Sequence, residues 1–383
     1  MHTSYIELSK SAMRNNVSYV RSRLPEGTTL SAVCKGNAYG HGIEQVVEMA
    51  EAAGIRHFSV FSSSEARRVQ QSIRHKSTIM IIGYIANEEL SWAIENNIEF
   101  YVFEMDRLLA AIETAKAAGK KAIIHIEVET GMNRTGFEEN VLPLLFDLLR
   151  ENKEYLQLQG LCTHFAGAES VANYLRVEQQ IAKYHVLYDR FCNEGLQPKL
   201  RHTACSAAAI NFPETTFDMV RVGIMLYGFW PNEETYIYQL RQQEHKGKDP
   251  LKRLIRWKSH IMNTKKVKMG EFIGYGTSYQ APRDMHIATI PVGYAYGFAR
   301  SLSNLGRVLV RGRRMHVIGV VNMNLAIIDI NELPDIQKGE EVVMVGKQGR
   351  QEVTVASFSE MSSQLNYELL TRLPLDIPRK IVK

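Results

Sequence analysis

The sequence lacks long apolar segments, contains few cysteines and carries only a small excess of one charge. No apolar run approaches the ~20 residues that a membrane-spanning helix needs, and 1–5 do not begin a signal peptide. The four cysteines show no paired metal-ligand spacing, and three of them lie in apolar strand-like runs, which fits reduced buried thiols better than a disulfide framework. The net charge is +5 with scattered basic residues, so a nucleic-acid track is not indicated. We expect a cytoplasmic protein with reduced thiols, no metal, and neither membrane nor nucleic acid as partner.

The sequence does contain a regular alternation of strand-like and helix-like segments over its first 230 or so residues. The strand-like runs are 29–35, 57–63, 78–84, 98–103, 122–129, 156–165, 200–206 and 219–228. Eight alternations in this length are typical of a (β/α)8 TIM barrel. An open, doubly wound sheet shares the pattern and stays an alternative at this point.

The pattern changes after Pro231. Residues 232–249 are polar and indicate a connector with a helical piece, and from Trp257 the apolar runs are short and extended. A chain of 383 residues also exceeds the usual size of one core. We therefore predict a barrel domain over 1–235 and a mainly β domain over 236–383, closed by a short helix at 366–372.

Lys35 is the most conspicuous residue of the first strand. It ends an apolar run and enters the small-residue stretch AVCKGNAYGHG at 32–42. A lysine partly desolvated at a strand end has a lowered pKa, and its neutral amine can condense with an aldehyde. The ordinary alternative is a lysine whose head group simply reaches water beside a glycine turn.

Further polar residues fall at the carboxyl ends of the predicted strands, where TIM barrels hold their sites. Taken singly, each could be a satisfied core histidine or a solvated arginine. A buried arginine inside a strand needs an acceptor, and the ends of strands seven and eight commonly hold a phosphate. The polar side chains of the set are Lys35, Arg134, His164, His202, Ser206 and Arg221, and the backbone of Gly223 and Ile224 lies with Ser206 where a phosphate would bind.

An aldehyde-binding lysine, a phosphate cup and a charged partner for a ring nitrogen together describe a pyridoxal 5'-phosphate (PLP) site, so we predict that the barrel domain over 1–235 binds PLP. The chain resembles the alanine racemase family over nearly its whole length, through AVCKGNAYGHG, HIEVETGMNRTGF, GLCTHFA, RHTACSAA, MVRVGIMLYG, IGYGTSY and NYELLTRLPLDIPR. The resemblance implies PLP as cofactor and a homodimer with shared sites. It implies that Lys35 bonds the cofactor aldehyde, that Tyr39 and Ser206 bind the phosphate, and that Arg221 faces the pyridine nitrogen.

The resemblance also implies an isomerase that interconverts L- and D-alanine with two bases. Lys35 would serve one face of the substrate carbon and Tyr275 of the neighbouring subunit the other. A phenol needs positive neighbours to act as a base near neutrality, and His164 and Arg134 are the candidates. His164 is further expected beside the cofactor, and Arg134 and Met323 at the substrate.

Several positions depart from the family pattern. Family members often have a carbamylated lysine where this chain has Glu127, and we hypothesise that Glu127 orients Arg134 directly. The other departures are Cys205, Tyr296, Asn324 and Leu375. They make a different or broader amino-acid specificity an alternative.

Two further alternatives differ in class. A PLP-holding protein without turnover has no use for a base on a second domain, so Tyr275 argues against it. A PLP decarboxylase of similar layout needs an acidic partner for the ring nitrogen, where this chain has Arg221.

Overall fold

The computed structural model describes residues 2–242, 248–357 and 366–383. Contacts between residues divide the chain into two units, a barrel unit of 11–35 and 46–253 and a β unit of 1–10, 36–45 and 254–383. The expected boundary between 235 and 236 stays a prediction, and the contacts assign the amino-terminal strand and residues 36–45 to the β unit. Of the expected connector at 232–249, residues 243–247 lie outside the described part of the chain.

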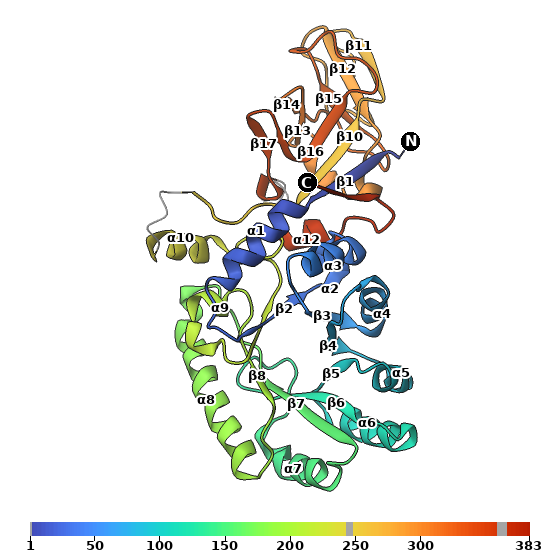
Figure 1. Ribbon diagram of the computed structural model, residues 1–383. Helices are drawn as coiled ribbons and strands as arrows, with labels where there is room; N and C mark the ends of the chain where they lie inside the picture. The colour runs from blue at the N-terminus through green and yellow to red at the C-terminus, as the bar shows by residue number, and fades with distance from the viewer. Residues whose placement is uncertain (1, 243–247, 358–365) are drawn as a thin grey trace. The chain divides into compact units, whose positions relative to one another are not determined.

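The barrel unit contains one eight-stranded parallel sheet, as the alternation of segments predicts (Figure 1). Its strands follow one another around the sheet in the order β8-β7-β6-β5-β4-β3-β2-β9. The sheet is nearly closed between its ends, because the N–H of Arg221 donates to the carbonyl of Ala204 across 3.0 Å. The strands are β2 (Thr29–Val33), β3 (His57–Ser62), β4 (Thr78–Tyr84), β5 (Glu99–Val102), β6 (Ala122–Glu127), β7 (Leu156–Cys162), β8 (Leu200–His202) and β9 (Met219–Val222).

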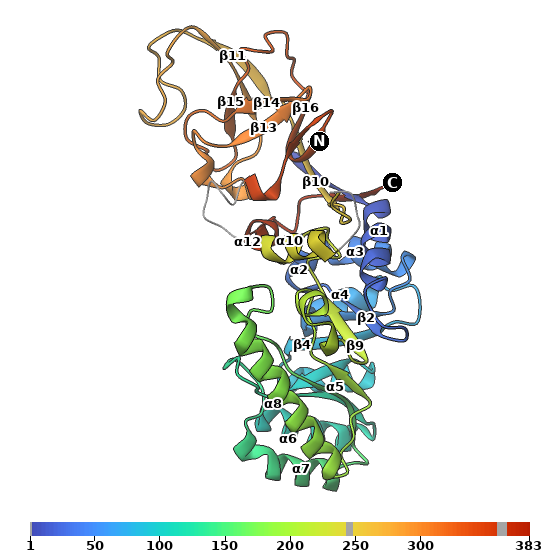
Figure 2. The same cartoon turned by 90° about the vertical axis from the view of Figure 1, so that its left-hand side faces the viewer.

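Amphipathic helices surround this sheet (Figures 1 and 2). In α7, for example, Leu142, Leu145, Phe146 and Leu149 form the buried stripe, and proline occupies an early position where no N–H is required. The helices are α1 (Lys10–Arg21), α3 (Ile43–Ala52), α4 (Ser63–Ser72), α5 (Leu90–Glu95), α6 (Met105–Ala118), α7 (Leu142–Glu151), α8 (Tyr174–Asn193), α9 (Ala208–Asn211) and α10 (Glu233–Gln242). Within the residues that the structure describes, no helix is long and apolar enough to cross a membrane.

The β unit is built on two antiparallel sheets with one parallel pair at the chain ends. The larger sheet runs β14-β13-β16-β10-β1-β18, and a smaller one runs β11-β12-β15. β1 pairs parallel with β18, so the two ends of the chain lie side by side. These strands are β1 (Ser4–Ser9), β10 (Ile255–His260), β11 (Asn263–Val267), β12 (Met285–Ile290), β13 (Arg307–Val310), β14 (Arg313–His316), β15 (Ala326–Asp329), β16 (Glu341–Gln348), β17 (Gln351–Val353), which pairs with β16, and β18 (Arg379–Val382). The predicted short helix is α12 (Asn366–Thr371).

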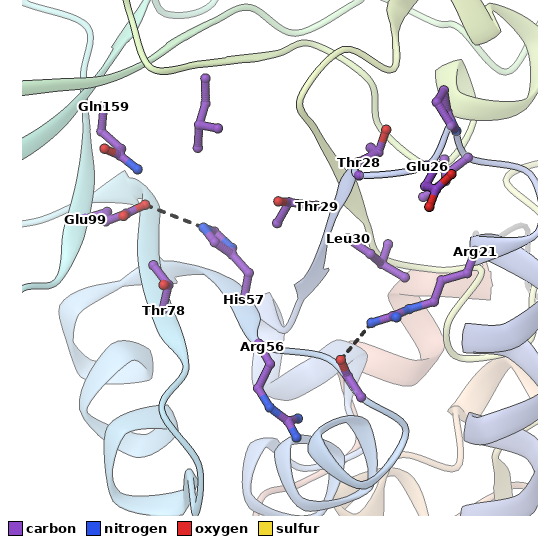
Figure 3. A pocket seen from close by; sticks show the side chains of 15 residues that line it. Arg21, Glu26, Thr28, Thr29, Leu30, Arg56, His57, Thr78, Glu99 and Gln159 are labelled. Atoms are coloured by element: carbon purple, nitrogen blue, oxygen red, sulfur yellow. Dashed lines mark hydrogen bonds and ion pairs between the residues drawn. The ribbon is translucent and has the colours of Figure 1, made fainter.

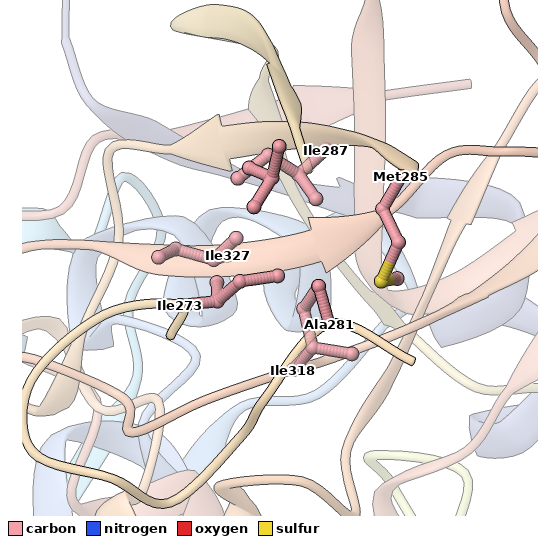
Figure 4. Close-up of a cluster of buried hydrophobic side chains, with 7 residues drawn as sticks. Ile273, Ala281, Met285, Ile287, Ile318 and Ile327 are labelled. Atoms are coloured by element: carbon pink, nitrogen blue, oxygen red, sulfur yellow. The ribbon is translucent and has the colours of Figure 1, made fainter. Parts of the chain in front are cut away.

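A compact apolar cluster of the β unit supports the loop that carries Tyr275 (Figure 4). Ile273 is 2% exposed and packs in this cluster with Ile287, Ile318 and others. Two residues further on, Tyr275 is 74% exposed. The loop is therefore anchored at Ile273 and presents the phenol to solvent in the single chain.

Candidate active site

Lys35 lies where β2 ends and a left-handed turn begins. α2 (Lys35–Tyr39) follows β2, and its backbone is left-handed from Gly36 to Tyr39, with φ between 52° and 62°. A non-glycine residue in this conformation costs roughly 1–2 kcal/mol, so the surrounding packing must hold the turn. The lysine consequently stands at the carboxyl end of the strand, as the sequence predicts.

The carboxyl-terminal segment holds this turn. A Cβ added to Gly40 would lie 1.7 Å from the carbonyl oxygen of Leu370, so only glycine fits there. Arg379 donates to the Gly40 carbonyl from Nε at 3.1 Å and from Nη2 at 2.9 Å. Tyr39, the expected phosphate ligand, is thereby carried on a backbone segment that is fixed from both sides.

The Lys35 amine lies in the field of two positively charged side chains. Lys35 is partly open to solvent, but protein atoms surround its amine closely. This partial burial lowers the pKa of the amine. The cations of Arg134 and Arg221 lower the pKa further, while Cys205 opposes the shift. In the described part of the chain, the Lys35 side chain makes no hydrogen bond or ion pair. The lowered pKa increases the fraction of the neutral amine, which is the form that attacks an aldehyde.

Arg221 in β9 is a buried guanidinium with one N–H left over. Nη1 donates to Nδ1 and to the carbonyl of His202, both at 2.6 Å. Nη2 donates to the carbonyls of Thr163 at 2.9 Å and Thr203 at 3.1 Å. The fifth donor, Nε–H, has no partner among the described residues and is not one of their fully enclosed polar atoms. An acceptor such as a pyridine nitrogen fits this donor.

The expected phosphate cup lies after β8 and β9. Ser206 Oγ accepts a hydrogen bond from the N–H of Gly223 at 3.0 Å, which brings the two segments together. The N–H of Ile224 has no partner in the described residues. A hydroxyl and adjoining backbone N–H groups are what a phosphate binds. Together with Lys35 and Arg221, these groups fit PLP.

His164 and Glu127 lie in the same electrostatic environment as the two arginines. Burial, then the charges of Arg221, Arg134 and Lys35, lower the pKa of His164 to about 3. Its imidazole is therefore neutral at neutral pH. Burial raises the pKa of Glu127, against its hydrogen bond to Thr135 and the nearby arginines.

Direct pairing of Glu127 with Arg134, which we hypothesised from the sequence, does not appear. Among the residues that the structure describes, no ion pair of 4.0 Å or less joins the two. Glu127 affects Arg221 and Arg134 through space, and Arg134 is exposed. The carboxylate is thus a nearby anion without a direct contact to Arg134.

The remaining expected site residues lie in the β unit. Tyr275 and Met323 are both exposed, Met323 to 55%. Of the departures from the family pattern, Leu375 is 68% exposed and Asn324 is exposed as well. All four residues lie in the β unit, whereas Arg134, His164 and Arg221 lie in the barrel unit.

Sequence reasoning missed a second group of polar side chains inside the barrel. Glu99 in β5 and His125 in β6 are buried and joined by a hydrogen bond of 2.9 Å. The sequence feature that could have revealed this group is the presence of a carboxylate and an imidazole in strands that are otherwise apolar. That signal does not say which residues meet, because the two positions are 26 residues apart.

Comparison with known proteins agrees with this geometry. The family model described as alanine racemase, N-terminal domain, matches residues 8–231, and that of the C-terminal domain matches residues 254–381. An alanine racemase from Leptospira interrogans is 33% identical over 382 residues, which cover 100% of this chain and 96% of that protein. One from Desulforamulus reducens is 34% identical over 378 residues, with 98% of each chain covered.

Solved structures give the same result. The crystal structure of alanine racemase from Bacillus anthracis matches with a TM-score of 0.91 and 29% identity, over 100% of this chain and 96% of that chain. The resemblance seen in the sequence is therefore confirmed in both domains. The chain belongs to the alanine racemase family.

Proposed function

We infer that this protein is a PLP-dependent amino-acid racemase that interconverts L- and D-alanine. The observation that carries this inference is the pairing of a lysine whose pKa is lowered with a buried arginine that keeps one N–H unused. The family to which the chain belongs supplies the activity and the cofactor. The substrate named for the relatives, alanine, comes to this chain through that membership.

The residues have distinct roles toward the cofactor. Lys35 would bond its aldehyde, Ser206 with the Gly223 and Ile224 backbone would bind its phosphate, and Arg221 would donate to its pyridine nitrogen. We include Tyr39 as a phosphate ligand and His164 as a neutral neighbour. When bound, PLP supplies the electron-withdrawing system that makes the α-proton of an amino acid removable.

Racemisation needs a proton removed on one face of the substrate carbon and returned on the other. We propose that Lys35 moves the proton on one face and that Tyr275 of a second subunit moves it on the other. The exposure of Tyr275 on an anchored loop of the β unit supports a homodimer with shared sites.

The charges around Tyr275 can be assigned more narrowly than the sequence allows. A neutral His164 cannot lower the pKa of a phenol electrostatically. Of the two expected neighbours, Arg134 alone would contribute a positive charge. We therefore assign Arg134 the roles of supporting Tyr275 and of binding the substrate carboxylate, with Met323 beside the substrate.

Arg221 controls the fate of the substrate once its α-proton has been removed. A guanidinium that keeps its charge disfavours a second positive charge on the pyridine nitrogen. With PLP bound, Arg221 would thereby weaken electron withdrawal by the ring and favour return of the proton over transamination. This assignment also separates the protein from decarboxylases, which need an acidic group at this place.

We place the enzyme in the cytoplasm, a proposal that its free cysteines support. All four lie in the described residues without a disulfide, two of them buried. Specificity for a side chain other than alanine remains the second candidate, favoured by Cys205, whose side chain lies near the Lys35 amine.

The proposal is tested by replacing Lys35 with alanine in the full-length protein. The variant should lose both the visible absorbance of covalently held PLP and turnover of L-alanine. A Lys35→Ala protein that still holds the cofactor covalently and racemises alanine would overturn the assignment.

A further inference from the structure

A chain of hydrogen bonds crosses the barrel interior from Arg221 to Glu99. Arg221 Nη1 lies 2.6 Å from His202 Nδ1, and His202 Nε2 lies 2.8 Å from His125 Nδ1. His125 Nε2 in turn lies 2.9 Å from Glu99 Oε2. Both histidines are 0% exposed, Arg221 is 5% and Glu99 is 6% exposed. Four strands, β9, β8, β6 and β5, thus contribute to one buried line of contacts.

The direction of these hydrogen bonds is set by what each group can do. A guanidinium only donates, so His202 Nδ1 accepts and the proton of that ring is on Nε2. His202 Nε2–H therefore donates to His125 Nδ1, which leaves the His125 proton on Nε2. That N–H donates to Glu99, a carboxylate that only accepts when ionised. Every donor in the line finds one acceptor.

The charge states fit this direction. Burial, then the charge of Arg221, lowers the pKa of His202 well below its usual value, and burial lowers that of His125. Burial opposes ionisation of Glu99, but His125 and His57 hold its pKa at about 2. The line therefore runs from a cation through two neutral rings to an anion. It is not a proton conduit, since Arg221 does not release its proton.

Arg221 needs this distant anion. A buried charge without compensation is costly, and in the described residues no carboxylate forms an ion pair with Arg221 within 4.0 Å. Glu127 acts on it only through space. The two polarised imidazoles link Arg221 to the carboxylate of Glu99 through a single Nη1–H of the guanidinium.

Glu99 is itself held at the amino-terminal end of the barrel, where it borders a cavity of about 720 Å³ (Figure 3). His57 points toward it, with Nε2 3.5 Å from Glu99 Oε2. His57 Nδ1 lies 2.8 Å from Ser31 Oγ, which lies 2.6 Å from Ser59 Oγ. A second histidine thus lies beside the same carboxylate oxygen that accepts the hydrogen bond from His125.

We propose that Glu99 is a positioning residue for Arg221, acting through His125 and His202. It compensates the arginine from the far end of the line and holds the guanidinium so that Nε–H stays directed at the open side of the barrel. The inference rests on the proposed function, because the pyridine nitrogen is what that N–H would meet.

The direction of the line can be read in the full-length protein without any assay of turnover. Histidine labelled with ¹⁵N, observed with and without PLP, reports which ring nitrogen carries the proton. We expect both His125 and His202 to be neutral with the proton on Nε2. A proton on Nδ1 of His202 would overturn the proposed direction. Variants of single histidines assign the signals among the twelve of the sequence.

The role of Glu99 is tested by Glu99→Gln, with Glu51→Gln as the matched control. Glu51 is 3% exposed and accepts hydrogen bonds from Arg74 and Ser77, so it is an equally buried carboxylate outside the line. Glu99→Gln should move the His202 Nε2–H resonance, weaken PLP binding about tenfold and change the visible spectrum of bound PLP. Glu99→Asp, which keeps the charge, should recover part of each effect. Glu51→Gln should leave all three unchanged.

Gly160 offers an independent way to break the line. A Cβ there would lie 2.1 Å from His125 Nδ1 and 2.8 Å from His202 Nε2. Gly160→Ala should therefore separate the two rings and reproduce the effects of Glu99→Gln. Combined in one chain, the two substitutions should weaken PLP binding no more than either alone, because both interrupt the same path.

The outcomes separate this inference from the proposed function. If Glu99→Gln leaves the His202 signal, PLP affinity and spectrum as in the wild type, or if Glu51→Gln lowers PLP affinity equally, Glu99 is not a positioning residue. In either case alanine racemisation by the wild type would stand. If the wild type fails to racemise any amino acid, the proposed function fails, while the ¹⁵N signals still report on the line.

Discussion

Arg221 Nη1 lies 2.6 Å from Nδ1 of His202, so a group that only donates fixes the proton of the ring on its other nitrogen. The same arginine directs three more N–H groups at carbonyl oxygens of neighbouring strand ends. Its remaining donor is oriented by these four contacts. Orientation of this side chain is therefore a property of the barrel before any cofactor binds.

Replacement of Arg221 by glutamine should change the outcome of the reaction as well as its rate. The neutral amide no longer disfavours a proton on the pyridine nitrogen, so transamination should increase relative to racemisation. Loss of a preorganised charge at the reacting system should lower kcat roughly 10²-fold. Simultaneous measurement of D-alanine and pyruvate checks both effects. An unchanged ratio of the two products would contradict the role given to Arg221.

Mixing two inactive variants tests the shared site. Lys35→Ala lacks one base and Tyr275→Phe the other, and each should be inactive in racemisation by itself. If each site combines Lys35 of one subunit with Tyr275 of its partner, random exchange should restore about a quarter of wild-type activity. The mixed protein is assayed after dissociation and reassembly. No recovery, with dimers formed, would place both bases in one subunit.

The pKa of Lys35 should lie below 10.5 because of burial and the charge of Arg134. Arg134→Leu removes that charge, so the pKa of Lys35 should rise. Acylation of the cofactor-free protein across a pH series, followed by mass spectrometry of the Lys35 peptide, gives both values. Exposed Lys121, on the surface of the same unit, serves as an internal reference. Equal Lys35 titration in the two proteins would show that Arg134 does not act on it.

The free energy of unfolding should decrease as the pH falls. Protonation of His164 in the unfolded chain should account for part of this decrease. The folded-state pKa of His164 is about 3, against about 6.5 in the unfolded chain. Above pH 6.5 both states are neutral, and as pH falls from 6.5 toward 3 the unfolded state gains the proton first. Between pH 6.5 and pH 3, each such histidine lowers the free energy of unfolding by up to about 1.4 kcal/mol for every unit by which the pH falls.

His164→Asn should remove this contribution in the cofactor-free protein. Urea unfolding at pH 7 and pH 5 measures the difference, which should be smaller in the variant than in the wild type. His75, which is exposed, provides a control as His75→Asn, expected to match the wild type. A pH dependence that His164→Asn does not alter would show that His164 is protonated in the folded state.

The barrel could be predicted because strand-like and helix-like segments alternate along the chain. Lys35 is found at the end of an apolar run, and Arg221 is found as a charged residue inside one. The pairing of β1 with β18 could not be predicted, since nothing local in a short terminal strand identifies a partner at the other end of the chain. The left-handed turn after Lys35 was equally hidden, because Asn37 and Ala38 adopt it under the constraint of the surrounding packing.

The contacts of Glu99 show a second limit of the sequence. Its position in β5 indicates an unusual buried charge, yet its partners come from other strands through the closure of the barrel. The hypothesis that Glu127 orients Arg134 directly stays a prediction, since the described residues show an interaction through space and no ion pair between the two. Seven residues of separation along the chain do not determine that the two side chains meet.

The central claim, racemisation of alanine through removal and return of the α-proton, is tested most directly by one measurement. The purified full-length protein with PLP is incubated with L-alanine in D₂O, and the enantiomers and their α-deuterium content are followed together. The account predicts conversion toward equal amounts of L- and D-alanine, with deuterium at Cα of the D-alanine formed. Persistence of L-alanine without D-alanine or α-deuterium, while PLP is bound to Lys35, would contradict it.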